Sequence, residues 1–239
     1  MTKYQKQTRF LAAVDCIVFG FDGNKLKILL IQRGFEPEIN KWSLVGGFIQ
    51  PEESAEDAAS RVLKKLTGLD GVYLEQLHTF SNPDRDPIER TISITYFALI
   101  DSNSYKKQIT DEYHAEWYAL NEIPDLIFDH REMVAMAKEK LRYKAALHPI
   151  LFELLPAKFT LPLLHNLFED VYETSFDKRN FSRKLLSTGL LLKQKEKDKG
   201  HSKKGAYYFK LDRKHYLKNF HKFQHIIPNP GGRINETAK

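Results

Sequence analysis

Residues 47–69, GFIQPEESAEDAASRVLKKLTGL, constrain the fold more than any other part of this sequence. The paired glycines Gly46 and Gly47 end a short apolar run, and Pro51 with the acids beside it suits the first turn of a helix. Gly68 supplies the left-handed end that helices favour. Between them runs an apolar stripe at helical spacing, formed by Ala55, Ala58, Ala59, Val62, Leu63 and Leu66. The segment predicts a strand, a loop and a helix that begins at residues 51–53 and buries one face.

The rest of the first 147 residues supplies the sheet that such a helix needs. Residues 10–20 and 25–32 are apolar and β-branched, and the turn sequence at Asp22 and Gly23 joins them as a hairpin. Further strands are expected around residues 43–48, 72–80, 90–100 and 116–120, and a long helix over 129–147. Because strands and helices mix, with mostly antiparallel neighbours, we predict an α+β domain over residues 1–147.

After residue 147 the pattern changes to short helices. A short apolar helix over 148–155 precedes a second helix that Thr160 can cap. A third helix over 178–188 buries one face and ends at Gly189. The residues expected on its buried face are Phe181, Leu185 and Leu186.

Two short strands follow these helices, at residues 190–193 and 206–211, joined by the basic loop QKEKDKGHSKKG. Three helices and a hairpin with a charged tip are typical of a winged helix-turn-helix. We predict this domain over residues 148–225 and a disordered tail over residues 226–239.

The positive charge of the chain is concentrated in its second half. Residues 178–222 hold 15 Lys and Arg against three acids, a net charge of +12, whereas the remainder holds 22 against 28, a net charge of −6. A basic segment on an acidic body is typical of nucleic-acid binding, although a solvated surface produces the same pattern. In a helix-turn-helix the second helix enters the major groove, and a basic wing suits backbone phosphates. We expect double-stranded DNA as a partner, contacted by Lys178, Arg179, Asn180, Ser182, Arg183 and Lys184 on the helix and by Lys195, Lys197, Lys203 and Lys204 on the wing.

A ligand pocket is expected in the first domain, where aromatic and charged residues gather on adjoining strands and loops. Aromatic walls with a few convergent charges suit a sugar or a nucleotide, although each residue alone is better explained by a core contact or a surface ion pair. The candidate effector-binding residues are Arg33, Lys41, Trp42, Phe48, Asp84, Arg85, Asp86 and Arg90.

Several classes of protein are excluded by composition. Cys16 is the single cysteine, so no disulfide framework exists. No apolar run approaches the roughly 20 residues of a membrane span, and the N-terminus has no signal-peptide pattern. We expect a cytoplasmic protein with no membrane partner.

The two halves together resemble the Nudix-related transcriptional regulators, which join a Nudix-like sensor domain to a winged helix. The strings that carry this resemblance are VDCIVFGF, KWSLVGGFI, FSNPDRDP, ERTISITYFALI, LIFDH, FTLPLLHNLFEDVYE and DKRNFSRKLL. The resemblance implies a Nudix-like α/β/α sandwich with a mixed sheet, a DNA-recognition helix within residues 177–186, and a homodimer that binds palindromic operators.

The Nudix box, G-x5-E-x7-R-E-U-x-E-E-x-G-U with U aliphatic, is only partly present. Its framework falls on Gly47, Glu53, Arg61, Leu63, Gly68 and Leu69. The glutamates that hold divalent cations in active members are Val62, Lys65 and Leu66 here. We therefore expect no catalytic residue, no metal ligand and no cofactor, and we expect Arg61 to form a structural ion pair, with Glu53 as its partner.

The leading hypothesis is a ligand-responsive repressor of sugar utilisation. Family members sense either L-arabinose and related sugars or ADP-ribose, and the strings VDCIVFGF and RGFEP favour the arabinose-responsive group. Two alternatives remain open. One is an ADP-ribose-sensing regulator of NAD metabolism. The other is an active pyrophosphatase in which Glu53, Glu56, Asp84 and Asp86 supply the carboxylates.

Overall fold

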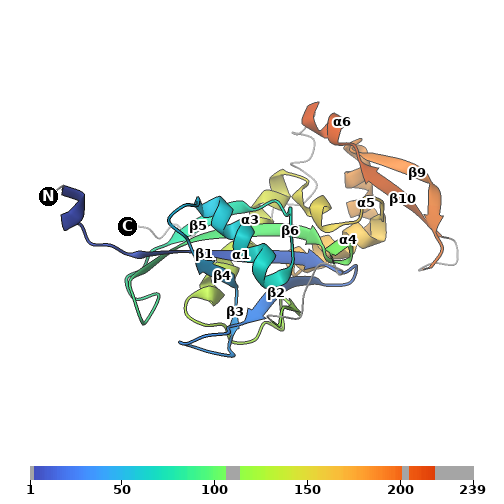
Figure 1. Cartoon of the computed structure of the whole chain (residues 1–239). Coiled ribbons are helices and arrows are strands. Elements are labelled where there is room, and N and C mark those ends of the chain that lie inside the picture. Colours follow the sequence, from blue (N-terminus) through green and yellow to red (C-terminus); the bar gives the residue numbers. More distant parts are fainter. Residues whose placement is uncertain (1–2, 106–113, 201–204, 219–239) are drawn as a thin grey trace, which may run out of the picture. The chain divides into compact units, whose positions relative to one another are not determined.

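Two long strands, β1 (Leu11–Phe21) and β6 (Thr91–Asp101), run parallel at the centre of the first of two units (Figure 1). The computed structural model describes residues 3–105, 114–200 and 205–218, and the units are Met1–Lys140 and Leu141–Lys239. Helix α3 (His130–Leu147) continues through the boundary between the units and ends where the sequence predicted a domain boundary. The predicted disordered tail lies outside the described residues.

The remaining strands of the first unit pair antiparallel around this centre, so the sheet is mixed, as predicted. The order is β3-β2-β1-β6-β5, and β4 pairs with β1 and β7 with β2. These strands are β2 (Leu26–Gln32), β3 (Trp42–Ser43), β4 (Val45–Phe48), β5 (Glu75–Phe80) and β7 (Glu116–Ala119). The predicted hairpin of residues 10–20 and 25–32 is present as β1 and β2. The predicted strand over 43–48 is divided, because β3 pairs with β2 whereas β4 pairs with β1.

The two faces of the central strands meet different helices. The even-numbered residues of β1 and β6, such as Cys16 and Tyr96, are buried with Val62 and Leu63 of α1 (Ala55–Thr67). Burying one such aliphatic side chain stabilises the fold by roughly 1.5–3 kcal/mol. Odd-numbered residues face α3 instead, since the Thr95 hydroxyl lies 3.8 Å from the Met133 sulfur. This alternation is the pleat of a strand, and it places Asp15 of β1 and Thr95 of β6 beside His130 and Met133 at the start of α3.

Helix α1 begins later than residues 51–53, where the sequence predicted its first turn. Ser54 is the N-cap, and its hydroxyl accepts a hydrogen bond from the Asp57 amide while Asp57 accepts from the Ser54 amide. This capping box satisfies two amide donors at the helix start, so it outcompetes Pro51 as the start signal. Gly68 ends the helix in the left-handed region, with φ 79°.

The second unit has the predicted winged-helix topology. It contains η2 (Ile150–Leu154), β8 (Phe159–Thr160), α4 (Leu161–Tyr172), α5 (Lys178–Ser187), β9 (Leu191–Asp198), β10 (Ala206–Leu211) and α6 (Arg213–Lys218). The three strands form a sheet in the order β8-β10-β9. Two further short helices, η1 (Lys3–Lys6) and α2 (Ser102–Tyr105), belong to the first unit.

The core of the second unit is built mainly of leucines and phenylalanines. Phe168 of α4 packs edge-on against Phe181 of α5, with ring centroids 5.1 Å apart. Leu185 is fully buried, but Leu186 is 44% exposed, so its predicted burial is wrong. One residue along a helix turns the side chain by about 100°, which carries Leu186 off the face that Phe181 and Leu185 share.

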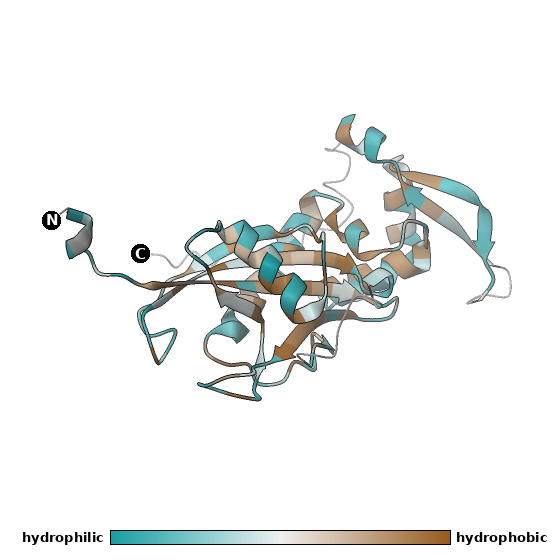
Figure 2. Cartoon of the chain, viewed as in Figure 1, coloured by the Kyte–Doolittle hydropathy of each residue, from teal (hydrophilic) through white to brown (hydrophobic). Residues whose placement is uncertain are grey.

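Strand β9 is longer than the predicted strand over residues 190–193. It runs to Asp198 because Lys197 pairs with Tyr207 and Asp198 with Ala206 on β10. Much of the predicted basic loop is therefore strand, and its residues are mostly hydrophilic (Figure 2). Among the described residues, no helix is long and apolar enough to cross a membrane.

Candidate functional site

A cavity of about 230 Å³ opens in the first unit beside the odd-numbered face of β1. Strands β1, β2 and β4 supply one side of its lining, and the loop before β6 and the residues leading into α3 supply the other. Four predicted effector-binding residues line it, namely Arg33, Phe48, Arg85 and Asp86. Residues that the sequence did not single out also line it, among them Asp15, Gln32, Phe35, Phe128 and His130.

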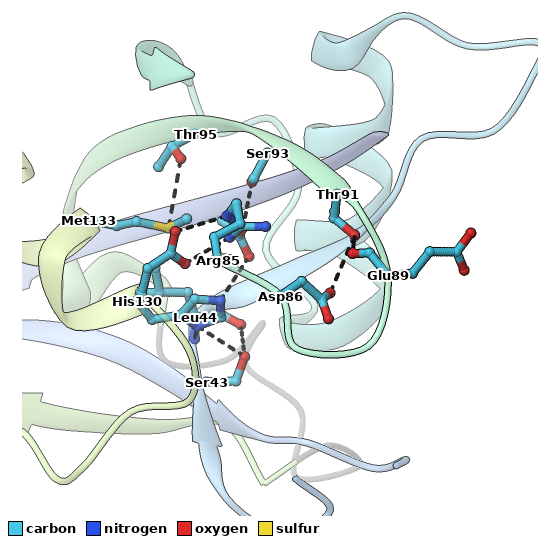
Figure 3. Close-up of polar contacts among 12 residues, drawn as sticks. Ser43, Leu44, Arg85, Asp86, Glu89, Thr91, Ser93, Thr95, His130 and Met133 are labelled. Atoms are coloured by element: carbon cyan, nitrogen blue, oxygen red, sulfur yellow. Dashed lines mark hydrogen bonds and ion pairs between the residues drawn. The ribbon is translucent and has the colours of Figure 1, made fainter. Parts of the chain in front are cut away.

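The wall of this cavity carries a buried group of charged side chains (Figure 3). Arg85 makes two 2.8 Å hydrogen bonds to the carboxylate of Asp129 and lies 3.7 Å from that of Asp15. The Ser93 hydroxyl donates to Asp15, and His130 Nε2 lies 3.6 Å from the other Asp15 oxygen. A side chain at Gly46 would overlap with the Asp15 carboxylate, so glycine is required there. The guanidinium offsets one of the two carboxylate charges, and the Ser93 hydroxyl provides Asp15 with a hydrogen bond, since buried charges need partners.

His130 is held neutral within this group. The Leu44 amide donates to its Nδ1 at 3.1 Å, which requires an unprotonated Nδ1 and leaves the ring proton on Nε2, facing Asp15. Burial lowers the pKa of His130, although Asp15 and Asp129 act in the opposite direction. The imidazole therefore joins β1 to the start of α3 as a fixed donor and acceptor.

Arg33 stands in a different environment on the same cavity. Its Nε donates to the Phe35 carbonyl oxygen at 3.2 Å. Its guanidinium lies 4.0 Å from the centroid of the Phe35 ring and 5.4 Å from that of Phe128. Rings on the faces of a guanidinium hold it in place while leaving its edge open to acceptors.

A second cavity of about 450 Å³ lies next to the first, and Arg85 and Phe128 line both. The predicted residue Asp84 lines this second cavity, together with Asn82, Asp129 and Glu132. Its polar lining is mostly acidic, so it suits uncharged or cationic groups better than phosphate.

Three predicted effector-binding residues lie away from both cavity linings. Lys41 forms an ion pair with Glu38. Trp42 packs edge-on against Tyr118, with ring centroids 5.0 Å apart. Arg90 donates to the Asn82 carbonyl oxygen and stacks on Phe10. The structure gives each of these side chains a partner within the protein.

Two central residues of the cavity wall were missed in the sequence, Asp15 and His130. Asp15 offered a signal, because it is the one charged residue in the apolar run FLAAVDCIVFG. A buried charge of this kind needs partners, and a strand with one buried carboxylate is a place to look for a polar site. His130 offered no comparable signal, since its role depends on the fold that places Leu44 and Asp15 beside it.

Arg61 of α1 forms the ion pair with Glu53 of the preceding loop that the sequence predicted. Arg61 Nε donates to Glu53 at 2.8 Å, and Arg61 Nη2 also donates to the Phe48 carbonyl oxygen. The hydrogen bond from Arg61 lowers the pKa of Glu53 to about 2. Glu53 also accepts a hydrogen bond from the Gln50 amide, so its carboxylate is fully engaged in fixing the loop before α1.

In the second unit, α5 presents its polar residues outward. Asp177 caps the helix by accepting from the Asn180 amide at 2.7 Å. Of the residues predicted to meet DNA, Lys178, Arg179 and Arg183 are exposed, and Asn180, Ser182 and Lys184 are half-buried. Arg183 donates to the Asn180 side-chain oxygen at 2.9 Å.

The turn that leads into α5 is fastened to α4 by two hydrogen bonds. His165 Nε2 donates to the Phe176 carbonyl oxygen, and the Phe176 amide donates to Glu169, both at 2.9 Å. Buried hydrogen bonds of this kind fix the direction in which the next helix leaves the turn, so α5 holds a defined orientation within this unit.

The wing carries exposed lysines on a strand that is anchored by Tyr207. Lys195 and Lys197 are both exposed on β9. The ammonium groups of Lys193 and Lys197 lie 3.7 and 4.4 Å from the centroid of the Tyr207 ring. Lys203 and Lys204 lie outside the described residues. An exposed row of ammonium groups on a hairpin is suited to backbone phosphates.

Two family models match the two units. One described as "NUDIX domain" matches residues 9–137, and one described as "NrtR DNA-binding winged helix domain" matches residues 151–211. The chain belongs to the Nudix family. The resemblance to Nudix-related transcriptional regulators, stated from the sequence, is thereby confirmed.

Relatives of this Nudix chain include a repressor that matches both of its units. An "ADPR responsive transcriptional repressor NtrR" of Acinetobacter baylyi is 33% identical over 226 residues, covering 92% of this chain and 90% of that protein. NrtR of Shewanella oneidensis, crystallised with a 27mer DNA, is 29% identical, with a TM-score of 0.75 over 86% of this chain and 95% of that one. Its NUDIX domain complexed with ADP ribose is 30% identical over 59% of this chain and 99% of that one, with a TM-score of 0.50. An ADP-ribose pyrophosphatase of Methanocaldococcus jannaschii is 34% identical over 60% of this chain and 80% of that protein.

These relatives overturn the expectation of L-arabinose sensing and sugar utilisation. The similar repressor is ADPR responsive, and the similar sensor domain was crystallised with ADP ribose. The string VDCIVFGF, which favoured arabinose, is almost entirely the buried strand β1. Such a string reflects core packing and carries little information about the effector.

The Nudix box of this chain does not fit a divalent cation. Glu53 is engaged by Arg61, Val62 is buried in the core, and Lys65 is an exposed cation. Within the described ranges, no three His, Cys, Asp or Glu side chains converge in a way that could hold a metal ion. Hard cations need several oxygen ligands, and α1 offers none that is unengaged at the positions of the box.

Proposed function

We propose that this Nudix chain is an ADP-ribose-responsive transcriptional repressor. It binds double-stranded DNA through α5 and the wing and binds its effector in the first unit. The observation that carries this proposal is the match, over 92% of the chain, to a repressor described as ADPR responsive. The regulated genes would be those of NAD metabolism, which is what the family resemblance implies.

The geometry of both units supports this proposal. Exposed arginines on a capped helix after a fastened turn suit base edges in a major groove, because Arg pairs bidentately with guanine. The first cavity combines aromatic side chains with an arginine, which suits a phosphate-bearing nucleotide. Effector binding lowers DNA affinity only if the effector binds the DNA-incompetent conformation of the protein more tightly than the DNA-competent one. A difference of a few kcal/mol between the two binding free energies is needed.

We further propose that the protein acts as a homodimer. Recognition of a palindromic operator places two α5 helices in successive major grooves, which one winged helix cannot do. Light scattering of the full-length chain tests this, with twice the mass of the 27.9 kDa chain expected. A monomer that binds its duplex with full affinity would contradict it.

The same proposal includes the absence of hydrolysis. The rival function is an ADP-ribose pyrophosphatase, which the M. jannaschii relative favours. The engaged Glu53 and the residues Val62, Lys65 and Leu66 argue against it. Incubation with ADP-ribose and Mg²⁺ is expected to release no AMP, and Mg²⁺-dependent release that Glu53→Gln abolishes would support the rival.

A thermal-shift measurement tests the effector. A ligand that binds only the folded state raises Tm, by an amount that grows with its concentration. ADP-ribose is expected to raise Tm of the full-length chain, and ribose 5-phosphate is expected to do so less because it has fewer groups to bind. No shift with ADP-ribose at millimolar concentration would contradict the proposal.

A further inference from the structure

Two arginines line the first cavity, and their partners differ. The Arg85 side chain is 4% exposed and is held by Asp129 at two nitrogens and by Asp15 at 3.7 Å. Its charge is already offset by two carboxylates, and its Nε and Nη2 both donate to Asp129. An anion placed beside Arg85 would also lie beside the carboxylates of Asp129 and Asp15, which repel it.

The Arg33 side chain is not hydrogen-bonded to a carboxylate of the described residues. Among the described residues, it contacts the Phe35 carbonyl oxygen, which takes Nε, and the rings of Phe35 and Phe128. No carboxylate is hydrogen-bonded to its two terminal nitrogens within that part of the chain. A planar guanidinium with an open edge is the group that binds phosphate bidentately, and here it lines a cavity.

The carboxylates near Arg33 are themselves engaged elsewhere. Glu38 pairs with Lys41, and Asp86 accepts hydrogen bonds from the Ile88 amide and the Thr91 hydroxyl. Asp86, Asp15 and Glu38 attract Arg33 without accepting a hydrogen bond from it. Asp86 and Asp15 line the cavity, so they repel an anion placed beside them. The open edge of Arg33 is therefore the most favourable position for negative charge in this lining.

We propose that Arg33 binds the diphosphate of the effector, whereas Arg85 shapes the cavity wall and does not bind the ligand. This assignment rests on the proposed function, since it takes a diphosphate-bearing nucleotide as the ligand. Phe35 and Phe48, which are 55% and 47% exposed, line the same cavity and offer rings for the base.

The test is calorimetric titration of the full-length chain with ADP-ribose, ADP and adenosine. Arg33→Gln keeps a polar side chain without the charge. It is expected to lower the affinities for ADP-ribose and ADP by about tenfold to a hundredfold, which corresponds to the loss of one charge-assisted hydrogen bond. Adenosine lacks phosphate, so its affinity is expected to change by less than about twofold. Arg33→Lys is expected to recover part of the lost affinity, because the lysine ammonium keeps the positive charge but cannot donate two parallel hydrogen bonds as the guanidinium does.

Lys27→Gln is the matched control, because Lys27 lies on β2, pairs with Asp22 and does not line the cavity. It is expected to leave the affinities for ADP-ribose and ADP unchanged. A Tm for Arg33→Gln close to that of the wild type establishes that the variant is folded, and Arg33→Lys gives a second measurement if it is not.

The outcomes separate the assignment from the proposed function. Wild-type binding of ADP-ribose that Arg33→Gln does not weaken overturns the assignment alone. Binding of ADP but not ADP-ribose overturns the proposed function, and the effect of Arg33→Gln on ADP still decides the assignment. A wild-type chain that binds neither diphosphate contradicts both.

Discussion

Arg85 in the first unit and Arg179 in the second carry the same side chain in opposite environments. Arg85 is buried between Asp129 and Asp15, whereas Arg179 is exposed on α5. The difference shows that positive charge serves two purposes here. Arg85 offsets carboxylate charge and fixes the cavity wall, whereas Arg179 is left available to a polyanion.

These two environments predict a division of effects between stability and binding. Removing a buried charge of the first unit is expected to change the free energy of unfolding. Removing an exposed charge of the second unit is expected to change DNA affinity and leave the unfolding free energy nearly unaltered, since surface substitutions usually stay within about 0.5 kcal/mol.

The largest effect is expected from Arg85→Ala. It leaves Asp129 and Asp15 buried without a counter-ion, which costs on the order of 3–5 kcal/mol in unfolding free energy. Urea unfolding of the full-length chain measures this, with Arg61→Ala as the control, because the Arg61 side chain is 34% exposed whereas that of Arg85 is 4% exposed. A loss below about 1 kcal/mol would show that this pair is no more than a surface salt bridge.

Arg179→Ala and Arg183→Ala are expected to have the next largest effect. If they contact bases, each costs about 1–3 kcal/mol in DNA affinity and relaxes base preference at one position of the operator. Fluorescence anisotropy with a duplex enriched from a random pool by the full-length chain gives both values. If both variants keep the wild-type preference among operator bases, another element reads the bases. A lower unfolding free energy in either variant would contradict the division between stability in the first unit and binding in the second.

A smaller effect concerns pH. Because burial lowers the pKa of His130, the unfolded chain binds this proton more readily than the folded one. Its contribution to stability is therefore complete above the unfolded pKa of about 6.5 and is lost as pH falls below it, by at most about 1.4 kcal/mol per pH unit. Unfolding free energy measured between pH 8 and pH 5 is expected to fall less steeply in His130→Asn, whose amide oxygen can accept from the Leu44 amide. Equal slopes in the two proteins would show that His130 does not titrate on unfolding.

The smallest effect is expected from single lysines of the wing. Lys195→Ala and Lys197→Ala each remove one exposed ammonium group, so affinity is expected to weaken evenly across DNA sequences. The slope of log affinity against log salt is expected to fall by about one for each phosphate that the variant no longer neutralises. A change in sequence preference instead would mean that the wing reads bases.

The fold was predictable where side chains follow a regular period. The 3.6-residue stripe of residues 55–66 predicted α1, and the faces of α5 and the hairpin predicted the second unit. The errors occurred where a local contact competes with the pattern, as when the capping box moved the start of α1 to Ala55. Leu186 was misplaced for a related reason, because its apolar character was given more weight than its angle on the helix.

The cavity was less predictable than the DNA-facing helix. Exposure on a helix can be judged from neighbours in sequence, whereas a cavity depends on residues that the fold brings together. Arg85 and Asp129 are 44 residues apart, and His130 meets Leu44 from 86 residues away. Arg33, Phe48, Arg85 and Asp86 line the cavity, and their role in effector binding stays a prediction. No sequence pattern separates the engaged Arg85 from the open Arg33.

Linkage between effector and DNA tests the central claim most directly. The affinity of the full-length chain for its selected duplex is measured with and without saturating ADP-ribose, and the affinity for ADP-ribose with and without saturating duplex. We expect ADP-ribose to weaken DNA binding at least tenfold and DNA to weaken ADP-ribose binding by the same factor, because coupling between two sites is reciprocal. Equal DNA affinity in both conditions, in a chain that binds ADP-ribose, would contradict it.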